Sequence, residues 1–321
     1  DTQLIVCYTL YIDPIKDKEL LMNNITELHP TSNPFNQESE LYFDTYERPI
    51  YFGGYSKANE LPEYYQDPEH KAIVRMLDGK PKQIGLVGKN YKVLPMKDIC
   101  LQVEDTFMDT MSNQELASVT TKDSISYHGG LCHREYIFPN INTDIGSSKS
   151  DIAFRTIIIN GYDGSSSFKF YNGAIDFFCT NGMVTGIYDM TVKRHTAGLT
   201  VPKLDNKLRE SIDIFYKQSA TWSKWVGKEI CDEDAEECFK AMPNISERRV
   251  DQLMRQFKIE CDSHGRTVWA LYSAATFYAT HTEGNFSVRE TGQQNKAATL
   301  MNREKQVRSW LNTDGFMELA A

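Results

Sequence analysis

The sequence predicts an α+β protein, with an antiparallel β-meander in the N-terminal two-thirds and a helical C-terminal part. Before about residue 190, short runs of β-branched and aromatic residues alternate with turn dipeptides such as Asp78-Gly79, a pattern typical of antiparallel hairpins. Beyond residue 200, apolar residues recur every three or four positions, which is the period of a buried helix face. We therefore divide the 321 residues into an acidic loop-rich segment (1–70), an antiparallel β core (71–200) and a helical region (201–321).

The first 70 residues differ in charge from the rest of the chain. They hold 13 of the 44 acidic residues but only 4 of the 35 basic ones, so residues 71–321 carry no net charge. Residues 3–12 are rich in β-branched and aromatic side chains and predict one strand. Residues 13–66 show no sustained apolar period, so we expect this acidic segment to be a peripheral, loop-rich cover rather than part of the core.

Two hairpins separated by a helix are predicted next. The expected strands are residues 72–77, 84–88, 119–126 and 131–138. Between the hairpins, apolar positions recur at helical spacing over residues 96–111. Residues 140–150 are rich in Asn, Gly and Ser and are predicted to be a linker.

A three-stranded meander is predicted from residue 154 to residue 186. Asp163-Gly164 supplies its first turn, because Asp-Gly readily adopts the positive φ of a tight hairpin. Asn172-Gly173 predicts a second turn for the same reason, and residues 179–182 close the third strand.

The helical region is predicted to hold five helices. The longest spans 202–228, which at ~1.5 Å per residue makes it roughly 40 Å long. A short acidic helix begins at Asp232, and Ser246 is expected to cap the next helix. Two more are expected around Trp269 and over residues 297–311.

Composition limits the class of protein. Apolar residues make up 40% and charged residues 25% of the chain, as in ordinary globular proteins. No apolar run approaches the ~20 residues of a membrane span, so we expect no membrane association and a cytoplasmic location. The seven cysteines lack CxxC spacing, which favours free thiols in a reducing compartment. The net charge of −9 argues against a non-specific nucleic-acid coat but permits a local basic groove.

Several segments, taken in order, resemble an uncharacterised phage/plasmid-like protein family that is defined by a domain of unknown function. The segments are residues 72–75, 85–93, 129–130, 162–166, 178–182, 194–196 and 269–278. The resemblance covers about residues 70–310 and implies a gene carried by phages or plasmids, near genes of DNA metabolism. The family pattern has a histidine before Asp-Gly-Ser, where this sequence has Tyr162. A β-meander followed by helices is also similar in outline to the single-strand annealing proteins of recombination.

Cations interleaved with aromatic residues point to a function. Proteins that bind single strands use cations for phosphates and aromatic faces for bases. The predicted nucleic-acid-binding residues are Tyr91, Lys92, Arg155, Tyr162, Asp163, Gly164, Lys169, Lys193, Arg194 and His195. We therefore expect a phage- or plasmid-encoded protein that binds nucleic acid, foremost single-stranded DNA, and acts in recombination or replication. We expect no cofactor or catalytic centre, and the ability to form homo-oligomers.

Within this set, Tyr91 and Tyr162 are expected to be stacking faces and the cationic residues to contact phosphates. Lys169 lies between two phenylalanines and must face the opposite side of its strand. We expect Lys169 and the run from Lys193 to His195 to lie along one backbone track. Tyr127 is a further aromatic residue of the strand-rich part. The alternative is that the aromatic residues are core and the lysines a solvated face.

Two other classes of function stay open. An acid–base or metal-dependent enzyme acting on nucleotides would bring Asp163, Asp176 and His195 together. A structural or host-interaction protein would use the acidic segment as its contact. The two Cys/His groups lack the usual spacing of zinc ligands, so structural roles are favoured for them. Their members are His128, Cys132 and His133 in one group and Cys231, Cys238, Cys261 and His264 in the other.

Overall fold

The computed structural model describes residues 34–35, 38–54, 63–146, 151–176, 182–183, 190–281 and 283–321, and the statements below concern these residues. The strand predicted at 3–12 lies outside them, as does most of the predicted turn at 179–182.

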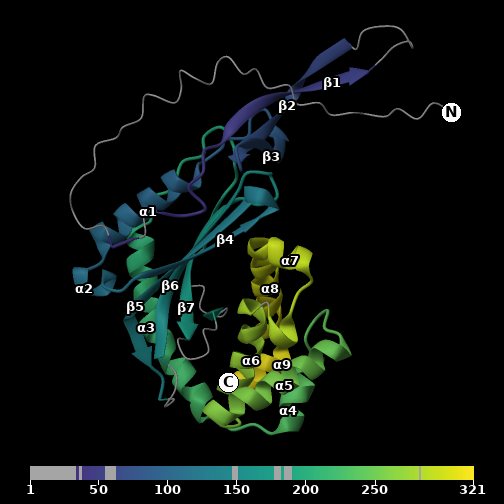
Figure 1. Cartoon of the computed structure of the whole chain (residues 1–321). Coiled ribbons are helices and arrows are strands. Elements are labelled where there is room, and N and C mark those ends of the chain that lie inside the picture. The colour runs from purple at the N-terminus through teal and green to yellow at the C-terminus, as the bar shows by residue number, and fades with distance from the viewer. Residues whose placement is uncertain are drawn as a thin grey trace, which may run out of the picture.

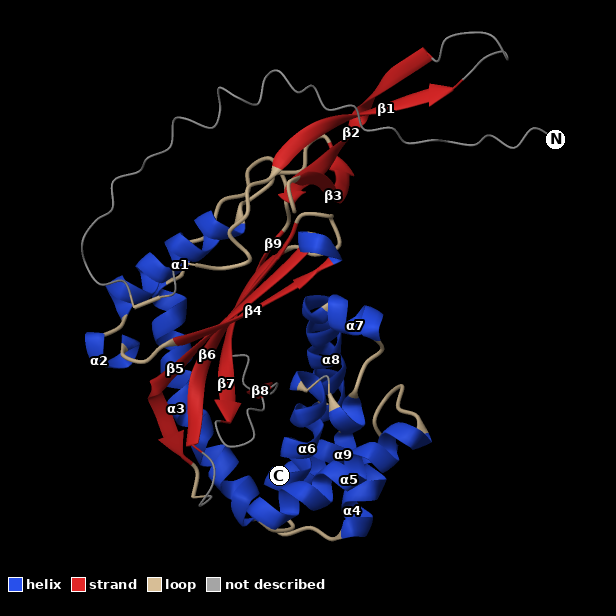
Figure 2. Cartoon of the chain, viewed as in Figure 1, coloured by secondary structure: helices blue, strands red, loops and turns tan. Residues whose placement is uncertain are grey.

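Two antiparallel sheets make up the strand-rich part (Figure 2). The strands are β1 (Tyr46–Gly54), β2 (Glu63–Leu77), β3 (Lys80–Gly88), β4 (Thr120–Ser126), β5 (Leu131–Asp144), β6 (Asp151–Gly161), β7 (Phe168–Asp176), β8 (Gly182–Met183) and β9 (Met190–Lys193). The first sheet has the order β1-β2-β3 and the second β4-β5-β6-β7-β8, with β9 also paired to β7. All these pairings are antiparallel.

Helices dominate from residue 205 onward. The α-helices are α1 (Met96–Thr110), α2 (Asn113–Leu116), α3 (Asp205–Gly227), α4 (Asp232–Lys240), α5 (Glu247–His264), α6 (Val268–Thr280), α7 (Glu290–Gln294), α8 (Lys296–Leu311) and α9 (Asp314–Ala320), with 3₁₀ turns η1 (Tyr127–Gly129) and η2 (Gly284–Phe286). The predicted α+β class is therefore confirmed. The predicted cap also holds, since the Ser246 side chain accepts a hydrogen bond from the Arg249 N–H. Among the described helices, none combines the length and apolarity needed to cross a bilayer.

The second sheet carries helices on both faces (Figure 1). On one face, Phe107 of α1 packs edge-on against Phe138 of β5, with ring centroids 5.1 Å apart. On the opposite face, Ala297 and Ala298 of α8 pack on Leu131, Ile157, Ile159 and Tyr171. Because successive strand residues point to opposite faces, one sheet supplies both packing layers.

The long helix α3 connects the sheet to the helical region. Its 23 residues span about 34 Å, a little shorter than predicted. Phe215 packs on Phe154 of the sheet, whereas Trp222 packs on Trp269 of α6. One continuous core therefore runs from the sheet into the helices.

Two glycines let the first sheet lie directly against the turns of the second. A Cβ on Gly85 of β3 would stand 2.1 Å from the Tyr162 carbonyl oxygen, and one on Gly130 would stand 2.6 Å from the Ile84 carbonyl oxygen. Only glycine permits backbones to approach so closely. The predicted Asp78-Gly79 hairpin turn is confirmed, with φ values of 50° and 74°.

The predicted turn at Asn172-Gly173 is wrong, because both residues lie inside β7. Asn172 is fully buried, and its amide oxygen accepts a hydrogen bond from Thr156 at 2.7 Å while its amide nitrogen donates to Ser211 of α3 at 3.0 Å. Tertiary partners thus satisfy an asparagine that would otherwise favour a turn, and the strand continues.

The predicted linker at 140–150 is only partly correct. Strand β5 continues to Asp144, and a bulge between Phe138 and Asn142 absorbs the proline at position 139. Asn140 donates hydrogen bonds to the carbonyls of Gln114 and Ala117, which satisfy its amide outside the ladder.

The acidic segment is not wholly a peripheral cover. Phe35 and Leu41 are buried in the main core, where Phe35 packs against Phe107 and Tyr136. Residues 46–54 form a full strand, β1, which the mixed sequence did not predict. Apolar residues scattered without a period reached the core because tertiary contacts, not local periodicity, placed them.

Candidate functional site

Tyr91 and His195 lie together, as the predicted site requires. Their rings stack with centroids 4.6 Å apart and planes 8° apart, and His195 Nδ1 donates a hydrogen bond to the Lys92 carbonyl at 2.9 Å. Burial lowers the pKa of His195, although this hydrogen bond opposes the shift. The imidazole is therefore neutral at pH 7. His195 is 7% exposed and supports the Tyr91 ring, and both residues line one surface hollow together with Lys89. Phosphate contact by His195 stays a prediction.

Tyr162 does not offer a stacking face. It is fully buried, its hydroxyl accepts a hydrogen bond from the Met96 N–H at 2.6 Å, and its ring packs on Phe43. It therefore satisfies a free N–H at the start of α1, which corrects the predicted role. The turn beside it forms as predicted, since Asp163 Oδ1 accepts from the Ser165 N–H and Gly164 has a φ of 78°.

Lys169 and Lys193 lie on opposite faces of the second sheet. In the register of β7 and β9, Phe168 pairs with Lys193 and Lys169 pairs with Val192. Paired residues point to the same face and neighbours to opposite faces. The single track predicted from Lys169 to Lys193 is therefore wrong, although Lys92, Lys193 and Arg194 are exposed and remain available to a ligand.

Arg155 was predicted at the surface but is buried. Its guanidinium donates to Glu135 at 2.6 Å and to Glu304 of α8 at 3.0 Å. Tyr171 donates to the second oxygen of Glu304 at 2.6 Å. Burial alone would raise the pKa of Glu135, but the charge of Arg155 holds it below its ordinary value. Arg155 therefore joins the sheet to α8 and is not a phosphate ligand.

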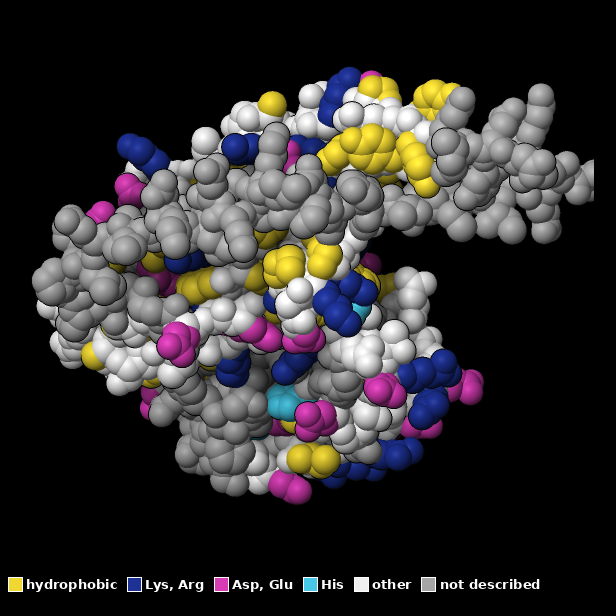
Figure 3. All heavy atoms as spheres, turned by 45° about the horizontal axis from the view of Figure 1, so that its top comes forward, with side chains coloured by type: hydrophobic (Ala, Val, Ile, Leu, Met, Phe, Trp, Pro, Cys, Tyr) yellow, Lys and Arg dark blue, Asp and Glu magenta, His cyan; other side chains and the backbone are white. Residues whose placement is uncertain are grey.

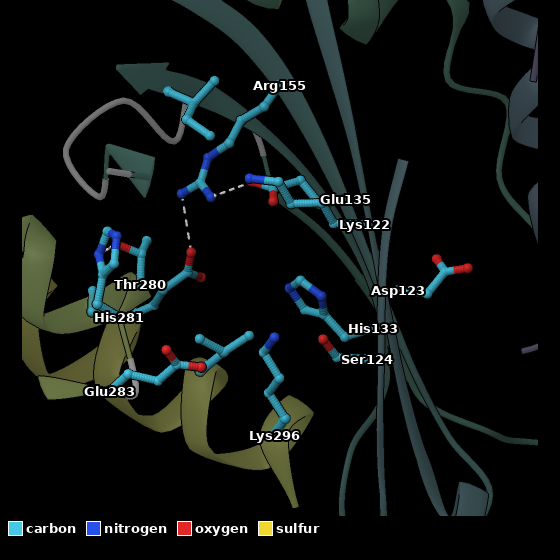
Figure 4. A pocket seen from close by; sticks show the side chains of 14 residues that line it. Lys122, Asp123, Ser124, His133, Glu135, Arg155, Thr280, His281, Glu283 and Lys296 are labelled. Carbon is cyan, nitrogen blue, oxygen red and sulfur yellow. Dashed lines mark hydrogen bonds and ion pairs between the residues drawn. The ribbon is translucent and has the colours of Figure 1, made fainter. Parts of the chain in front are cut away.

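These groups line a polar cavity of about 510 Å³ between the second sheet and the helices (Figure 4). Its lining includes Lys122, Ser124, His133, Glu135, Arg155, Ile175, Thr280, His281, Glu283, Lys296, Leu300 and Glu304. His133 and Lys296 point toward its centre, whereas Asp123 points away from it. Asp123 instead binds Arg134 through two hydrogen bonds of 2.8 Å.

His133 is the most unusual group of this cavity. It is buried, and within the described part of the chain its Nδ1 has no hydrogen-bond partner. Burial lowers the pKa of His133, so the ring is neutral at pH 7. With Asp123 turned away, three cations (Lys122, Arg155, Lys296) face three carboxylates (Glu135, Glu283, Glu304). This balance suits a polar ligand without net charge better than a phosphate chain.

The residues of the alternative enzyme site do not converge. Asp163 lies in the turn before β7, whereas Asp176 ends that strand, roughly 26 Å along it. Over the ranges that the structure describes, no three His, Cys, Asp or Glu side chains come together to hold a metal ion. The five described cysteines are free thiols, of which Cys100, Cys132 and Cys238 are buried.

A second hollow, which we name the Tyr127 groove, lies beside the η1 turn. It has a volume of about 810 Å³, and its polar lining is Glu40, Arg75, Lys82, Gln83, Tyr127, His128, Gln294 and Asn295. Tyr127 lines this groove and is 46% exposed. Figure 3 shows Lys and Arg side chains beside His side chains on one face of the molecule.

The backbone of η1 holds Tyr127 in place. Tyr127, His128 and Gly129 have φ values of 55°, 58° and 112°, and the Tyr127 N–H donates to Asn295 Oδ1 at 2.9 Å. Consecutive non-glycine residues in this region are strained, a feature that concentrates at functional sites. A Cβ at Gly129 would stand 2.8 Å from the Phe43 ring, so only glycine fits there.

Sequence reasoning included Tyr127 among the aromatic residues but did not place it in the site, and it missed Arg75 and Lys82. The two cations lie on β2 and β3, far from Tyr127 in sequence. The signal in the sequence that could have pointed to Tyr127 was the turn His128-Gly129-Gly130, because the residue before it lies at the end of a hairpin. Arg75 is held by the Phe43 ring, 3.8 Å from its centroid, and donates to the His128 carbonyl at 3.2 Å.

The family model described as "Domain of unknown function (DUF932)" matches residues 83–303, well over half of the chain. The chain belongs to this family. The DUF932 region begins within β3 and ends within α8, so it contains the second sheet and nearly all of the polar cavity. The predicted membership of an uncharacterised domain family is therefore confirmed. Searches of curated proteins and of solved structures each found no match.

Proposed function

We propose that this DUF932 protein binds single-stranded nucleic acid, with the Tyr127 groove as its primary contact. The observation that carries the proposal is a partly exposed tyrosine on a strained turn, which lines the same groove as the cations Arg75 and Lys82. Base stacking on such a ring stabilises binding by about 1–3 kcal/mol per base. Cations beside it neutralise the phosphates that flank the stacked base.

Charge supports this groove over the polar cavity. Among the lining residues of the groove, the two cations Arg75 and Lys82 face one carboxylate, Glu40. In the cavity, the only buried arginine already binds two carboxylates. A phosphate would therefore meet two cations and one carboxylate in the groove, whereas in the cavity it would meet three cations and three carboxylates, with Arg155 already bound to two of them.

The exposed residues Lys92, Lys193 and Arg194 extend the proposed contact. The end of β9 and the η1 turn lie at the same end of the second sheet, separated by four strand spacings of ~4.8 Å, or about 19 Å. A single strand laid across this end would meet Tyr127 first and these three cations last. The family resemblance supports a phage or plasmid origin, a host-cytoplasm location and a role in recombination or replication. Assembly of several copies would lengthen the track.

Fluorescence anisotropy with labelled single- and double-stranded oligonucleotides, over a salt series, tests the proposal. Tyr127→Ala should weaken single-strand binding about 5- to 150-fold, whereas Tyr127→Phe keeps the stacking face and should bind normally. Lys82→Ala should make the log–log salt slope shallower by about 0.7.

Two variants serve as matched controls. Tyr216 on α3 is 45% exposed, and Lys258 on α5 is exposed, so Tyr216→Ala and Lys258→Ala remove equivalent groups outside the groove. Both should leave affinity and salt slope unchanged. If the wild-type chain shows no salt-dependent affinity for any oligonucleotide, the proposal fails and a structural or host-interaction role takes its place.

A further inference from the structure

Lys169 occupies an environment that does not satisfy its charge. It projects from the α8 face of β7, is partly buried, and its Nζ donates to Met301 Sδ at 3.5 Å. A thioether sulfur is a weak acceptor. Within the described ranges, no carboxylate lies in ion-pair distance of this ammonium group.

Helix α8 places two more cations beside Lys169. Met301, Lys305 and Arg308 are spaced by four and three residues, so they share one face of the helix. Since Lys169 touches Met301, the two cations lie one and two turns further along the face that it contacts. We name these residues (Lys169, Lys305 and Arg308) the Lys169 cluster.

Arg308 is also unsatisfied. Its Nε is buried and has no hydrogen-bond partner among the described residues. Most buried donors in proteins are paired with protein or water. Within the described ranges, this unpaired Nε donor belongs to a half-buried side chain on the same helix face as the exposed Lys305.

The acidic residue nearest in sequence does not neutralise the cluster. Both oxygens of Glu304 are occupied, one by Arg155 and one by Tyr171. Burial lowers the pKa of Lys169, and the charges of Lys305 and Arg308 lower it further. Among the residues that the structure describes, the cluster therefore holds like charges together without a paired carboxylate.

We propose that the Lys169 cluster binds a phosphate group, supplied by a nucleic-acid backbone or by a free phosphorylated molecule. Arginine offers two parallel N–H donors that match phosphate oxygens, and lysines act as neighbouring point charges. The site is separate from the Tyr127 groove. Asn295 borders the groove at the start of α8, and Lys305 and Arg308 lie ten and thirteen residues later, roughly 15–20 Å along the helix.

The first test measures the thermal stability of the full chain in pyrophosphate against chloride at equal ionic strength. Pyrophosphate should raise the Tm of the wild-type chain, and the Lys169→Met/Arg308→Gln variant should lose this rise. In chloride the variant should be at least as stable as the wild type, because it removes like-charge repulsion. The control Arg255→Gln/Lys258→Met, with exposed cations on α5 three residues apart, should keep the full rise.

The source of the phosphate follows from two further ligands, a single-stranded oligonucleotide and AMP. A variant-sensitive rise with AMP and pyrophosphate identifies a free phosphorylated molecule. A salt slope for the oligonucleotide that is shallower by about 1.4 in the variant, without any AMP effect, identifies a nucleic-acid backbone. If wild type and variant respond alike to all three ligands, the phosphate site is refuted. Tyr127→Ala reports on the Tyr127 groove alone. If that variant binds oligonucleotides normally, the proposed groove fails, but the result for the Lys169 cluster still stands.

Discussion

Arg155 of β6 binds Glu304 of α8 at 3.0 Å, which joins residues 149 positions apart in the sequence. The same guanidinium binds Glu135 of β5, and Tyr171 of β7 binds the same Glu304. Three strands and one helix thus meet in one buried polar network. This network fixes α8 over the sheet and sets one wall of the polar cavity.

Glu304→Ala should destabilise the protein by about 3–5 kcal/mol, because it leaves a buried arginine with one fewer counter-charge and the Tyr171 hydroxyl without its acceptor. Glu304→Gln keeps an acceptor for the hydroxyl and should cost less. Urea unfolding measures both. Glu318→Ala, an exposed acid on α9, is the control and should change stability by ~0.5 kcal/mol or less. Equal stability of the Glu304→Ala and Glu318→Ala variants would show that the network contributes nothing.

Gly85→Ala should destabilise the contact between the two sheets by about 3 kcal/mol, since the new Cβ would stand 2.1 Å from a backbone oxygen. A Cβ added at Gly198 would have no neighbouring atom within 4 Å among the described residues, so Gly198→Ala should be neutral or slightly stabilising. Thermal unfolding of both variants gives the comparison. A Gly85→Ala protein as stable as the control would contradict the close approach of β3 to Tyr162.

Glu104 should make stability depend on pH. It is 1% exposed, and burial raises its pKa to about 7, against an ordinary value of 4.5. Arg134 lies 3.3 Å from Glu104 and opposes this rise in pKa, but burial outweighs its charge. Between pH 4.5 and pH 7, the Glu104 carboxyl therefore keeps its proton in the folded state and loses it in the unfolded state. Its stabilisation is complete below pH 4.5 and is lost as pH rises through 7, by about 3 kcal/mol in total.

Urea unfolding at pH 5 and pH 8 checks this dependence. Glu104→Gln keeps an acceptor for the Tyr136 hydroxyl, which donates to Glu104 at 2.7 Å. The stability difference between wild type and Glu104→Gln should change by about 3 kcal/mol between the two pH values. A difference that does not change with pH would mean that Glu104 is ionised in the folded protein throughout this range.

Tyr91 should control the titration of His195. Burial lowers the pKa of His195, and the stacked Tyr91 ring contributes to that burial. Tyr91→Ala should therefore raise the pKa of His195 toward its ordinary value, as measured by NMR titration of the imidazole. Tyr91→Phe keeps the stack and loses only the hydrogen bond to the Gly161 carbonyl, so the pKa should stay low. An unchanged pKa in Tyr91→Ala would assign the burial of His195 to other neighbours.

The sequence alone determined the class of fold and most of its local elements. Turn dipeptides such as Asp78-Gly79 require positive φ, and helical apolar periods extend over many residues, so both signals are local and survive into the structure. The site residues were less predictable, because their positions depend on contacts with residues distant in the sequence. Tyr91 and His195 lie in contact, but neither the burial of Tyr162 nor that of Arg155 is encoded near those residues.

The tertiary structure decided the features that depend on partners distant in the sequence. Asn172-Gly173 is a turn signal by local preference, yet hydrogen bonds from Thr156 and to Ser211 keep Asn172 inside a strand. An arginine is expected at the surface because it is rarely buried unless paired. Glu135 and Glu304 provide the charges that allow Arg155 to be buried. Arg75, Lys82 and Tyr127 form one groove only because β3 lies across the turns of the second sheet. Placing a residue against its local conformational preference costs about 1 kcal/mol or less. Breaking a buried ion pair costs several kcal/mol. Where the two conflict, the tertiary contacts therefore prevail.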